Sequence, residues 1–187
     1  PHEALSLVAE KGLDCTAFAL AENPGSASEI AQKQGFPVAL KVSSPDIVHK
    51  SDAGGVQLNL DTPEAVEKAY GELLARLKNS LHQAKIDGVL VNKMAPAGQE
   101  VIIGMNRDPQ FGPIMLFGLG GVLVEIFRDV VLWHPPLGRK DALEMIQQIK
   151  GYPVLAGYRG QPPVDMNALA DCLLAVAELA EENPKIV

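Results

Sequence analysis

From residue 88 onward the sequence is a series of short apolar segments separated by turn-forming residues. These segments cover residues 88–94, 100–105, 114–117, 122–127 and 130–133. Parallel neighbours in a sheet need a crossover of about a dozen residues or more, so connections this short join only antiparallel neighbours. The second half of the chain is therefore expected to form an antiparallel sheet.

Apolar residues at helical spacing predict five helices. These cover residues 3–11, 26–34, 63–81, 140–150 and 165–181. Ser26 and Glu29 have the spacing of a capping box, Thr62 precedes Pro63 at the first helical position, and Asp165 is an expected N-cap. The long helix after Pro63 has the clearest buried stripe.

Extended segments also occur in the first half, through Phe18 and over residues 38–42 and 56–60. The predicted fold class is α+β: an N-terminal part of helices and strands leads into an antiparallel sheet that carries helices. We expect two subdomains, residues 1–87 and 88–187.

Composition excludes several function classes. The 187 residues carry 23 acidic and 16 basic side chains, a net charge of −7, which disfavours nucleic acid and anionic lipid as partners. No run of eighteen apolar residues or signal peptide is present, so the protein is expected to be cytoplasmic. Cys15 and Cys172 lack metal-ligand spacing and are expected to be reduced core residues.

Lys41 is the only charged residue in the apolar strand 38–42, so it is expected to reach an anionic group or, alternatively, to extend its stem to solvent. No Walker phosphate loop occurs, and residues 118–121 lack the third glycine of a dinucleotide-binding loop. Backbone amides can approach a phosphate closely at glycines. The candidate phosphate loops contain Gly54, Gly55, Gly120 and Gly121.

Five segments together resemble a known family. They cover residues 35–42, 45–56, 98–104, 107–113 and 117–125. In residue types and order they are similar to the ATP-grasp domain of ADP-forming (NDP-forming) acyl-CoA synthetases, of the acetate–CoA ligase beta-subunit type. The resemblance implies two subdomains that enclose ATP or ADP with Mg2+. It also implies reversible conversion of acyl-CoA, ADP and phosphate to a free acid, CoA and ATP through a phosphohistidine.

The resemblance also assigns roles to individual positions. Lys41 corresponds to the phosphate-contacting lysine, and Glu100 is expected to accept a ribose hydroxyl. The adenine hinge corresponds to Val91, Asn92, Lys93 and Met94. Asn92 departs from the more usual Gln or Glu of the family, which leaves the details of adenine contact open.

His49 corresponds to the histidine that receives the phosphoryl group and passes it to ADP. A neutral imidazole nitrogen is available near neutral pH, so a histidine suits this role. Lys50 and the Gly54 and Gly55 amides are expected to stabilise the phosphorylated ring, and Asp46 or Asp52 to orient it. The alternative is a loop histidine that only bonds backbone.

Three other positions are open to two readings, and a fourth to one. Glu125 is expected near the phosphohistidine or the metal, with a structural salt bridge as the alternative. Arg107 and Asp108 either take part in the site or shape a turn with Pro109. His134 is expected to be structural.

The chain opens without methionine and stops before the acidic strand that supplies metal ligands in the family, so we expect an excised piece whose metal ligands lie beyond residue 187. The expected partners are CoA-binding and ligase domains of the same or a partner chain, an acyl-CoA or carboxylic acid substrate, and further copies in an oligomer. The alternative function is a non-catalytic regulatory domain of a larger protein such as a lysine acetyltransferase.

Overall fold

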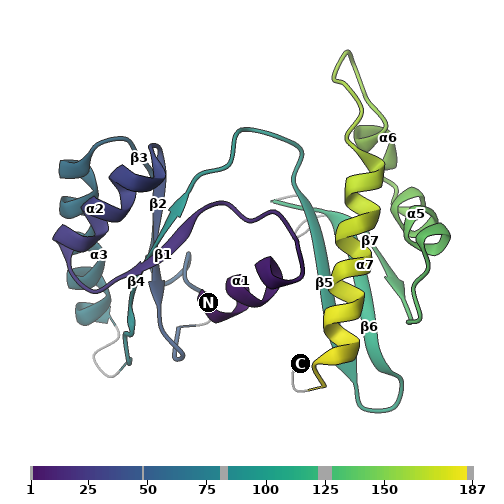
Figure 1. Cartoon of the computed structure of the whole chain (residues 1–187), viewed down its shortest axis with the longest axis horizontal. Coiled ribbons are helices and arrows are strands. Elements are labelled where there is room, and N and C mark those ends of the chain that lie inside the picture. Colours follow the sequence, from purple (N-terminus) through teal and green to yellow (C-terminus); the bar gives the residue numbers. More distant parts are fainter. Residues whose placement is uncertain (1, 48, 81–83, 122–127, 185–187) are drawn as a thin grey trace. The chain divides into compact units, whose positions relative to one another are not determined.

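The computed structural model describes residues 2–47, 49–80, 84–121 and 128–184 (Figure 1). The chain divides into two compact units, the first made of residues 1–9 and 14–96 and the second of residues 10–13 and 97–187. Each unit contains an antiparallel sheet and helices, so the predicted α+β class is confirmed. The boundary at residue 96 differs from the expected boundary at residue 87.

The first unit contains a four-stranded sheet with the strand order β1-β4-β2-β3, in which every neighbouring pair is antiparallel. The strands are β1 (Phe18–Ala21), β2 (Val38–Ser43), β3 (Val56–Leu60) and β4 (Gly88–Lys93). The sequence grouped residues 88–93 with the second subdomain. The structure places β4 in the first sheet because its backbone pairs with β1 on one side and β2 on the other.

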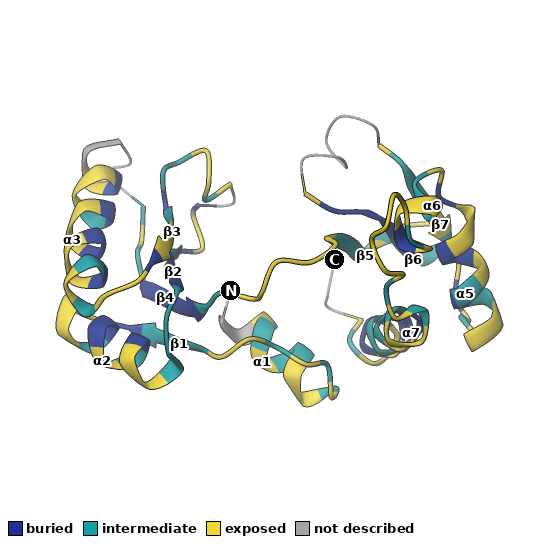
Figure 2. Cartoon of the chain, turned by 90° about the horizontal axis from the view of Figure 1, so that it is seen from above, coloured by how far each residue is buried: buried dark blue, intermediate teal, exposed yellow. Residues whose placement is uncertain are grey.

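Two helices supply the core of this unit: α2 (Pro24–Gln34) and α3 (Pro63–Ser80). Figure 2 shows buried residues along one side of α3 and on the strands. The side chains that pack between helices and sheet include Ala27, Ala31, Val38, Leu40, Val42, Val66, Leu73, Leu77, Val89 and Val91. A third helix, α1 (His2–Glu10), confirms the first predicted helix.

Helix α2 begins earlier than predicted. Its N-cap is Asn23, whose side chain accepts a hydrogen bond from the Ser26 N–H (2.8 Å), while the Asn23 N–H donates to Ser26 Oγ (3.2 Å). Ser26 is thus the second member of the capping box rather than its first, and Pro24 occupies the opening turn, where its fixed φ suits a helix. The cap of α3 is as predicted, because Thr62 Oγ1 accepts from the Ala65 N–H.

The second unit contains a three-stranded sheet of β5 (Val101–Asp108), β6 (Gly112–Leu119) and β7 (Val130–Trp133) in that order. Both pairs are antiparallel, as the sequence predicted. The expected strand at 122–127 lies outside the described residues. Helices α5 (Arg139–Gln148), α6 (Tyr152–Leu155) and α7 (Met166–Glu182) complete the unit. Asp165 caps α7 as predicted, whereas the short α6 was not anticipated.

The core of the second unit lies between one face of its sheet and α5 and α7. It includes Met115, Phe117, Leu119, Ala142, Met145, Ile146, Leu155, Ala170 and Leu173. Among the helices that the structure describes, none combines the length and apolarity that crossing a membrane requires. Cys15 and Cys172 are free thiols, and burial raises the pKa of Cys172, which favours its neutral form.

Candidate functional site

Lys41 lies on the sheet face of the first unit that is opposite to the helices. Strand side chains alternate between faces, and Val38, Leu40 and Val42 of β2 pack into the core. Lys41 therefore points to the other face, as the only residue of β2 that is not fully buried. Strand β2 is an inner strand of the sheet, so this ammonium projects from the sheet interior rather than from its edge.

Two buried polar atoms of the same face have no hydrogen-bond partner among the described residues. Asn92 pairs with Ala39, two residues before Lys41, and its Oδ1 is unbonded although the residue is only 7% exposed. Ser43, two residues after Lys41, is fully buried and its Oγ is also unbonded. A buried polar group without a partner costs about 1–3 kcal/mol, so a pair of them beside a lysine makes this face a candidate site for a polar ligand.

His49 is exposed on the loop between β2 and β3. The loop folds back on itself after this residue: the Ala53 N–H donates to His49 O (3.2 Å), and the Gly55 N–H donates to Lys50 O (2.7 Å). The Asp46 carboxylate accepts from the Lys85 N–H (2.7 Å), so its bonded oxygen is engaged by backbone. A role for His49 in phosphoryl transfer stays a prediction.

Packing and hydrogen bonds within the loop explain why glycine occupies positions 54 and 55. The Gly54 N–H donates to Ser51 O and the Gly55 N–H to Lys50 O, so both amides are engaged within the loop. A Cβ on Gly55 would lie 2.6 Å from Val42 Cγ1, which only glycine avoids. The phosphate contact predicted for these amides would require the turn to open, and it remains a prediction.

The predicted adenine hinge at residues 91–94 is engaged in the sheet and its surroundings. The Lys93 N–H donates to Ala17 O (2.8 Å) and the Met94 N–H to Pro37 O (3.1 Å). The Lys93 ammonium donates to Phe36 O, close to the C-terminal end of α2. Recognition of adenine by the Lys93 and Met94 amides would therefore need these bonds to exchange, whereas the Asn92 side-chain oxygen has no competing partner in the described part of the chain.

In the second unit, Glu100 lies against the other glycine pair. Its carbonyl accepts from the Gly120 N–H (2.8 Å), and a Cβ on Gly121 would lie 2.5 Å from the Glu100 carboxylate. Gly121 has φ +63°, a conformation that favours glycine. The structure thus brings Glu100, Gly120 and Gly121 together at the start of β5 and the end of β6, while Glu125 lies outside the described residues.

Arg107 and His134 have structural roles. Arg107 donates to Ala180 O (2.7 Å) near the end of α7, where a cation complements the helix dipole. The ring nitrogens of His134 contact the carbonyl oxygens of Phe111 and Pro135. His134 is thus structural, as expected, and the structure favours a structural role for Arg107 as well.

Asp108 shapes the turn between β5 and β6. Its Oδ1 accepts from the Gln110 N–H (2.8 Å) and the Phe111 N–H (3.0 Å), and these bonds hold the pKa of the carboxyl below its usual value of 3.8. The structure therefore favours the turn-shaping role.

This lowered pKa predicts an acid-dependent loss of stability. A carboxyl whose pKa is lower in the folded state stabilises the fold above pH 3.8, and this contribution disappears as the pH falls through the folded value. Urea denaturation measures the free energy of unfolding at pH 7 and at pH 3. The decrease in this free energy from pH 7 to pH 3 should be smaller for Asp108→Asn than for the parent chain. An equal difference in the two proteins would contradict the role of this carboxylate.

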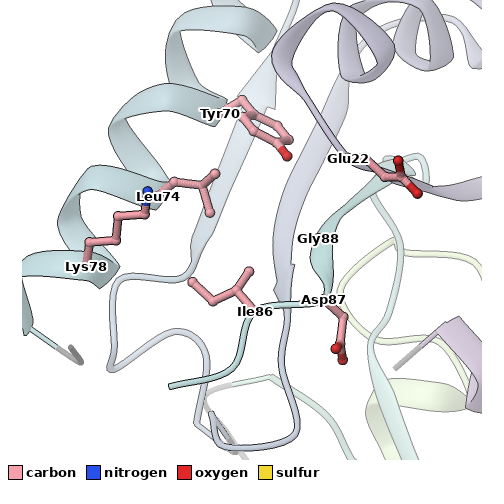
Figure 3. Close-up of a pocket in the computed structure, with 7 residues that line it drawn as sticks. All are labelled: Glu22, Tyr70, Leu74, Lys78, Ile86, Asp87 and Gly88. Atoms are coloured by element: carbon pink, nitrogen blue, oxygen red, sulfur yellow. The ribbon is translucent and has the colours of Figure 1, made fainter. Parts of the chain in front are cut away.

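A cavity lies elsewhere on the first unit (Figure 3). It measures about 410 Å³ and is lined by Glu22, Tyr70, Leu74, Lys78, Ile86, Asp87 and Gly88. Figure 3 shows Tyr70, Leu74 and Ile86 pointing toward its interior. Burial, with a smaller contribution from Glu22, raises the pKa of Tyr70, so its hydroxyl stays neutral. None of the sequence motifs pointed to this cavity.

Two residues of the site were missed by reading the sequence. Ser43 was detectable, because strand alternation places it on the face of Lys41. Arg76 of α3, whose Nη1 donates to Gly54 O (3.0 Å), carried no such signal, because the residues are 22 positions apart.

Comparison with known proteins establishes the class. All of residues 1–187 match the ATP-grasp domain family, and the chain belongs to it. It is 45% identical over 184 residues to the acetate–CoA ligase [ADP-forming] I subunit beta of Pyrococcus furiosus, covering 98% of this chain and 79% of that one. It is 44% identical over 185 residues to the acetate–CoA ligase [ADP-forming] I of Archaeoglobus fulgidus, covering 99% of this chain but only 27% of that longer one.

Solved structures of similar proteins support the same family assignment. The dinucleotide forming acetyl-coenzyme A synthetase 1 of Candidatus Korarchaeum cryptofilum, in complex with coenzyme A, Ca-AMPCP and HgCl+, has a TM-score of 0.93 and 46% identity, with 97% of this chain and 80% of that one covered. In another structure of that protein, bound to coenzyme A and Mg-AMPPCP, a phosphohistidine segment points towards the nucleotide binding site (TM-score 0.81, 44% identity, 97% and 78% coverage).

Proposed function

We propose that the chain is the nucleotide-binding and phosphoryl-transferring module of an ADP-forming acyl-CoA synthetase. In the proposed reaction, acyl-CoA, ADP and phosphate are converted reversibly to acid, CoA and ATP through a phosphohistidine at His49. The observation that carries the proposal is the sheet face of the first unit where Lys41 lies between Asn92 Oδ1 and Ser43 Oγ, two buried atoms that have no hydrogen-bond partner among the described residues. The relatives named above are all acyl-CoA ligases or synthetases, which supports a catalytic rather than a regulatory module.

Three successive residue pairs, each between β4 and β2, follow one another along this face and define two ends for it. Asn92 lies opposite Ala39, Leu90 opposite Lys41, and Gly88 opposite Ser43. Alternate residues of a strand are about 7 Å apart, so the three pairs span about 13 Å. With adenine at the Asn92 end and a phosphate at Lys41, the terminal phosphate lies toward Ser43.

The loop that bears His49 leaves β2 directly after Ser43, at the proposed phosphate end of this face. In the proposed transfer, an oxygen of the terminal phosphate of ADP attacks phosphohistidine. The new P–O bond forms as the P–N bond breaks, and the electron pair of the P–N bond returns to the imidazole nitrogen. Lys41 would balance the negative charge of the phosphates, so that positioning and electrostatics supply the catalysis.

Mg2+ would neutralise phosphate charge when it is bound with the nucleotide. Over residues 2–47, 49–80, 84–121 and 128–184, the structure contains no group of three or more His, Cys, Asp or Glu side chains that could hold a metal. Mg2+ is usually held by one or two carboxylates together with substrate phosphates, so a group of three side chains is not required for it.

The proposed partners are CoA-binding and ligase domains, in the same polypeptide or in a companion subunit. One relative is a subunit, and another is a longer chain of which this chain spans about a quarter. We propose that the acyl group, CoA and the first phosphorylation belong to those domains, that the assembly is oligomeric, and that it is cytoplasmic.

Ser43 offers a test of the sheet face. Ser43→Ala removes a buried hydroxyl for which the described residues offer no hydrogen-bond partner, so the free energy of unfolding should stay unchanged or rise by up to about 1 kcal/mol. ATP affinity should fall several-fold, because the hydroxyl would bond the terminal phosphate. The measurements are urea denaturation and calorimetric titration with ATP.

Ser44→Ala is the matched control. Ser44 is also buried, but its Oγ accepts from the Asp46 N–H (3.1 Å), so this variant should lose about 1 kcal/mol of stability and keep its ATP affinity. Unaltered ATP affinity in Ser43→Ala would remove Ser43 from the site.

A further inference from the structure

The loop between β2 and β3 is attached to the rest of the first unit on both sides of His49. On the N-terminal side, the Asp46 carboxylate accepts from the Lys85 N–H (2.7 Å). The next residue, Ile47, is 4% exposed and belongs to the hydrophobic core. This attachment lies three residues before His49 and joins the loop to the segment that leads into β4.

On the C-terminal side, the attachment is the guanidinium of Arg76 on α3. Its Nη1 donates to Gly54 O (3.0 Å). Gly54 has φ +69°, and a Cβ at this position would lie only 2.8 Å from Arg76 Cδ. The stem of the arginine thus fills the space that the glycine leaves, so the contact is one of packing as well as hydrogen bonding.

A short turn connects the second attachment to His49. The Ala53 N–H donates to His49 O, and the Gly54 N–H donates to Ser51 O (3.0 Å). Gly54 directly follows Ala53, so a displacement of Gly54 is expected to reach the backbone of His49 through this one residue. His49 itself is exposed between the two attachments.

We propose that Arg76 and Asp46 are positioning residues for phosphoryl transfer at His49. They act on the loop backbone, because each is bonded to a main-chain group on the loop or beside it. The inference rests on the proposed function, since it requires His49 to be the phosphorylated residue. Misplacement of a reacting group by about 1 Å costs on the order of 100-fold in rate, so loss of either attachment should slow transfer strongly without altering the nucleotide face.

The test uses the full-length parent protein with radiolabelled ATP, and measures acid-labile phosphate on histidine together with ADP affinity and thermal stability. Arg76→Ala and Asp46→Ala should each slow labelling by about 10- to 100-fold, with ADP affinity within about twofold of the parent protein.

Conservative variants separate positioning from a general structural role. Asp46→Asn retains an oxygen that can accept from the Lys85 N–H, and Arg76→Lys retains a donor, so both should recover most of the labelling rate. Lys68→Ala is the matched control, because Lys68 is an exposed cation on the same helix, paired only with Glu72 among the contacts described.

The outcomes are distinguishable. Labelling of Arg76→Ala and Asp46→Ala at the parent rate would overturn the positioning role and leave the proposed function intact. Equal losses of labelling, ADP affinity and thermal stability would also overturn it, because they indicate a general structural role. If the parent protein incorporates no label at His49, both the proposed function and this inference fail.

Discussion

Replacing His49 by alanine in the full-length protein should abolish ATP formation from acyl-CoA, ADP and phosphate, with a loss of more than about 1,000-fold in rate, because removal of a nucleophile leaves no covalent route. ADP affinity should change by less than about twofold. The structure supports this separation, since His49 lies on an exposed loop whereas Lys41 lies on the sheet face. Coupled ATP detection and calorimetric titration with ADP measure the two effects.

His134→Ala is the control for this experiment. His134 contacts the carbonyl oxygens of Phe111 and Pro135 in the second unit, so its loss should affect stability rather than turnover. Preserved ATP formation in His49→Ala, or loss of ADP binding with turnover retained, would refute the phosphohistidine assignment.

Replacing Lys41 by alanine should weaken ATP binding by about 10- to 100-fold, because a charge-assisted hydrogen bond is worth about 1.5–3 kcal/mol. The effect should be larger for ATP than for adenosine, since the ammonium would contact phosphate and not the base. Lys41→Met should behave like the alanine variant, because it keeps much of the stem and loses the charge. Calorimetric titrations with ATP, ADP and adenosine measure this difference.

Lys33→Ala removes one positive charge from the same unit, at the exposed C-terminal turn of α2, and serves as the control for net charge. Its ATP affinity should equal that of the parent chain. Should Lys41→Ala bind ATP with an unaltered dissociation constant, Lys41 would be a lysine that merely extends to solvent, and the proposed nucleotide face would be lost with it.

Much of the fold could be read from local patterns. The helical stripe of α3 corresponds to an observed helix, because it buries one face against the core. The segment read as β3 is also a strand, but its expected alternation is not seen: only Leu60 joins the core, Leu58 is 50% exposed, and the register with β2 shifts along the strand. The start of α2 was misread, since Ser26 and Asn23 are both good capping residues and only the backbone geometry selects Asn23. The partnership of β4 was also misread, because short connections do not show where one sheet ends and another begins.

The candidate site was less accessible to sequence reasoning. Lys41 was recognisable because a single charge in an apolar strand is unusual. The glycine pair at residues 54–55 suggested an anion site, yet the structure shows its amides bonded within the loop and its missing side chains filled by Arg76 and Val42. A glycine signals close approach of some group without identifying that group.

The order of residues along the chain determined which side chains alternate on β2, where most helices begin and end, and which motifs resemble the ATP-grasp family. These properties depend on neighbours a few positions apart, so local spacing is enough to predict them. Only the tertiary structure decided that β4 joins the first sheet, that Asn92 and Ser43 carry unbonded atoms beside Lys41, and that Arg76 holds the His49 loop. Those contacts join residues far apart in sequence, and burial and hydrogen-bond satisfaction are settled only when the whole unit packs.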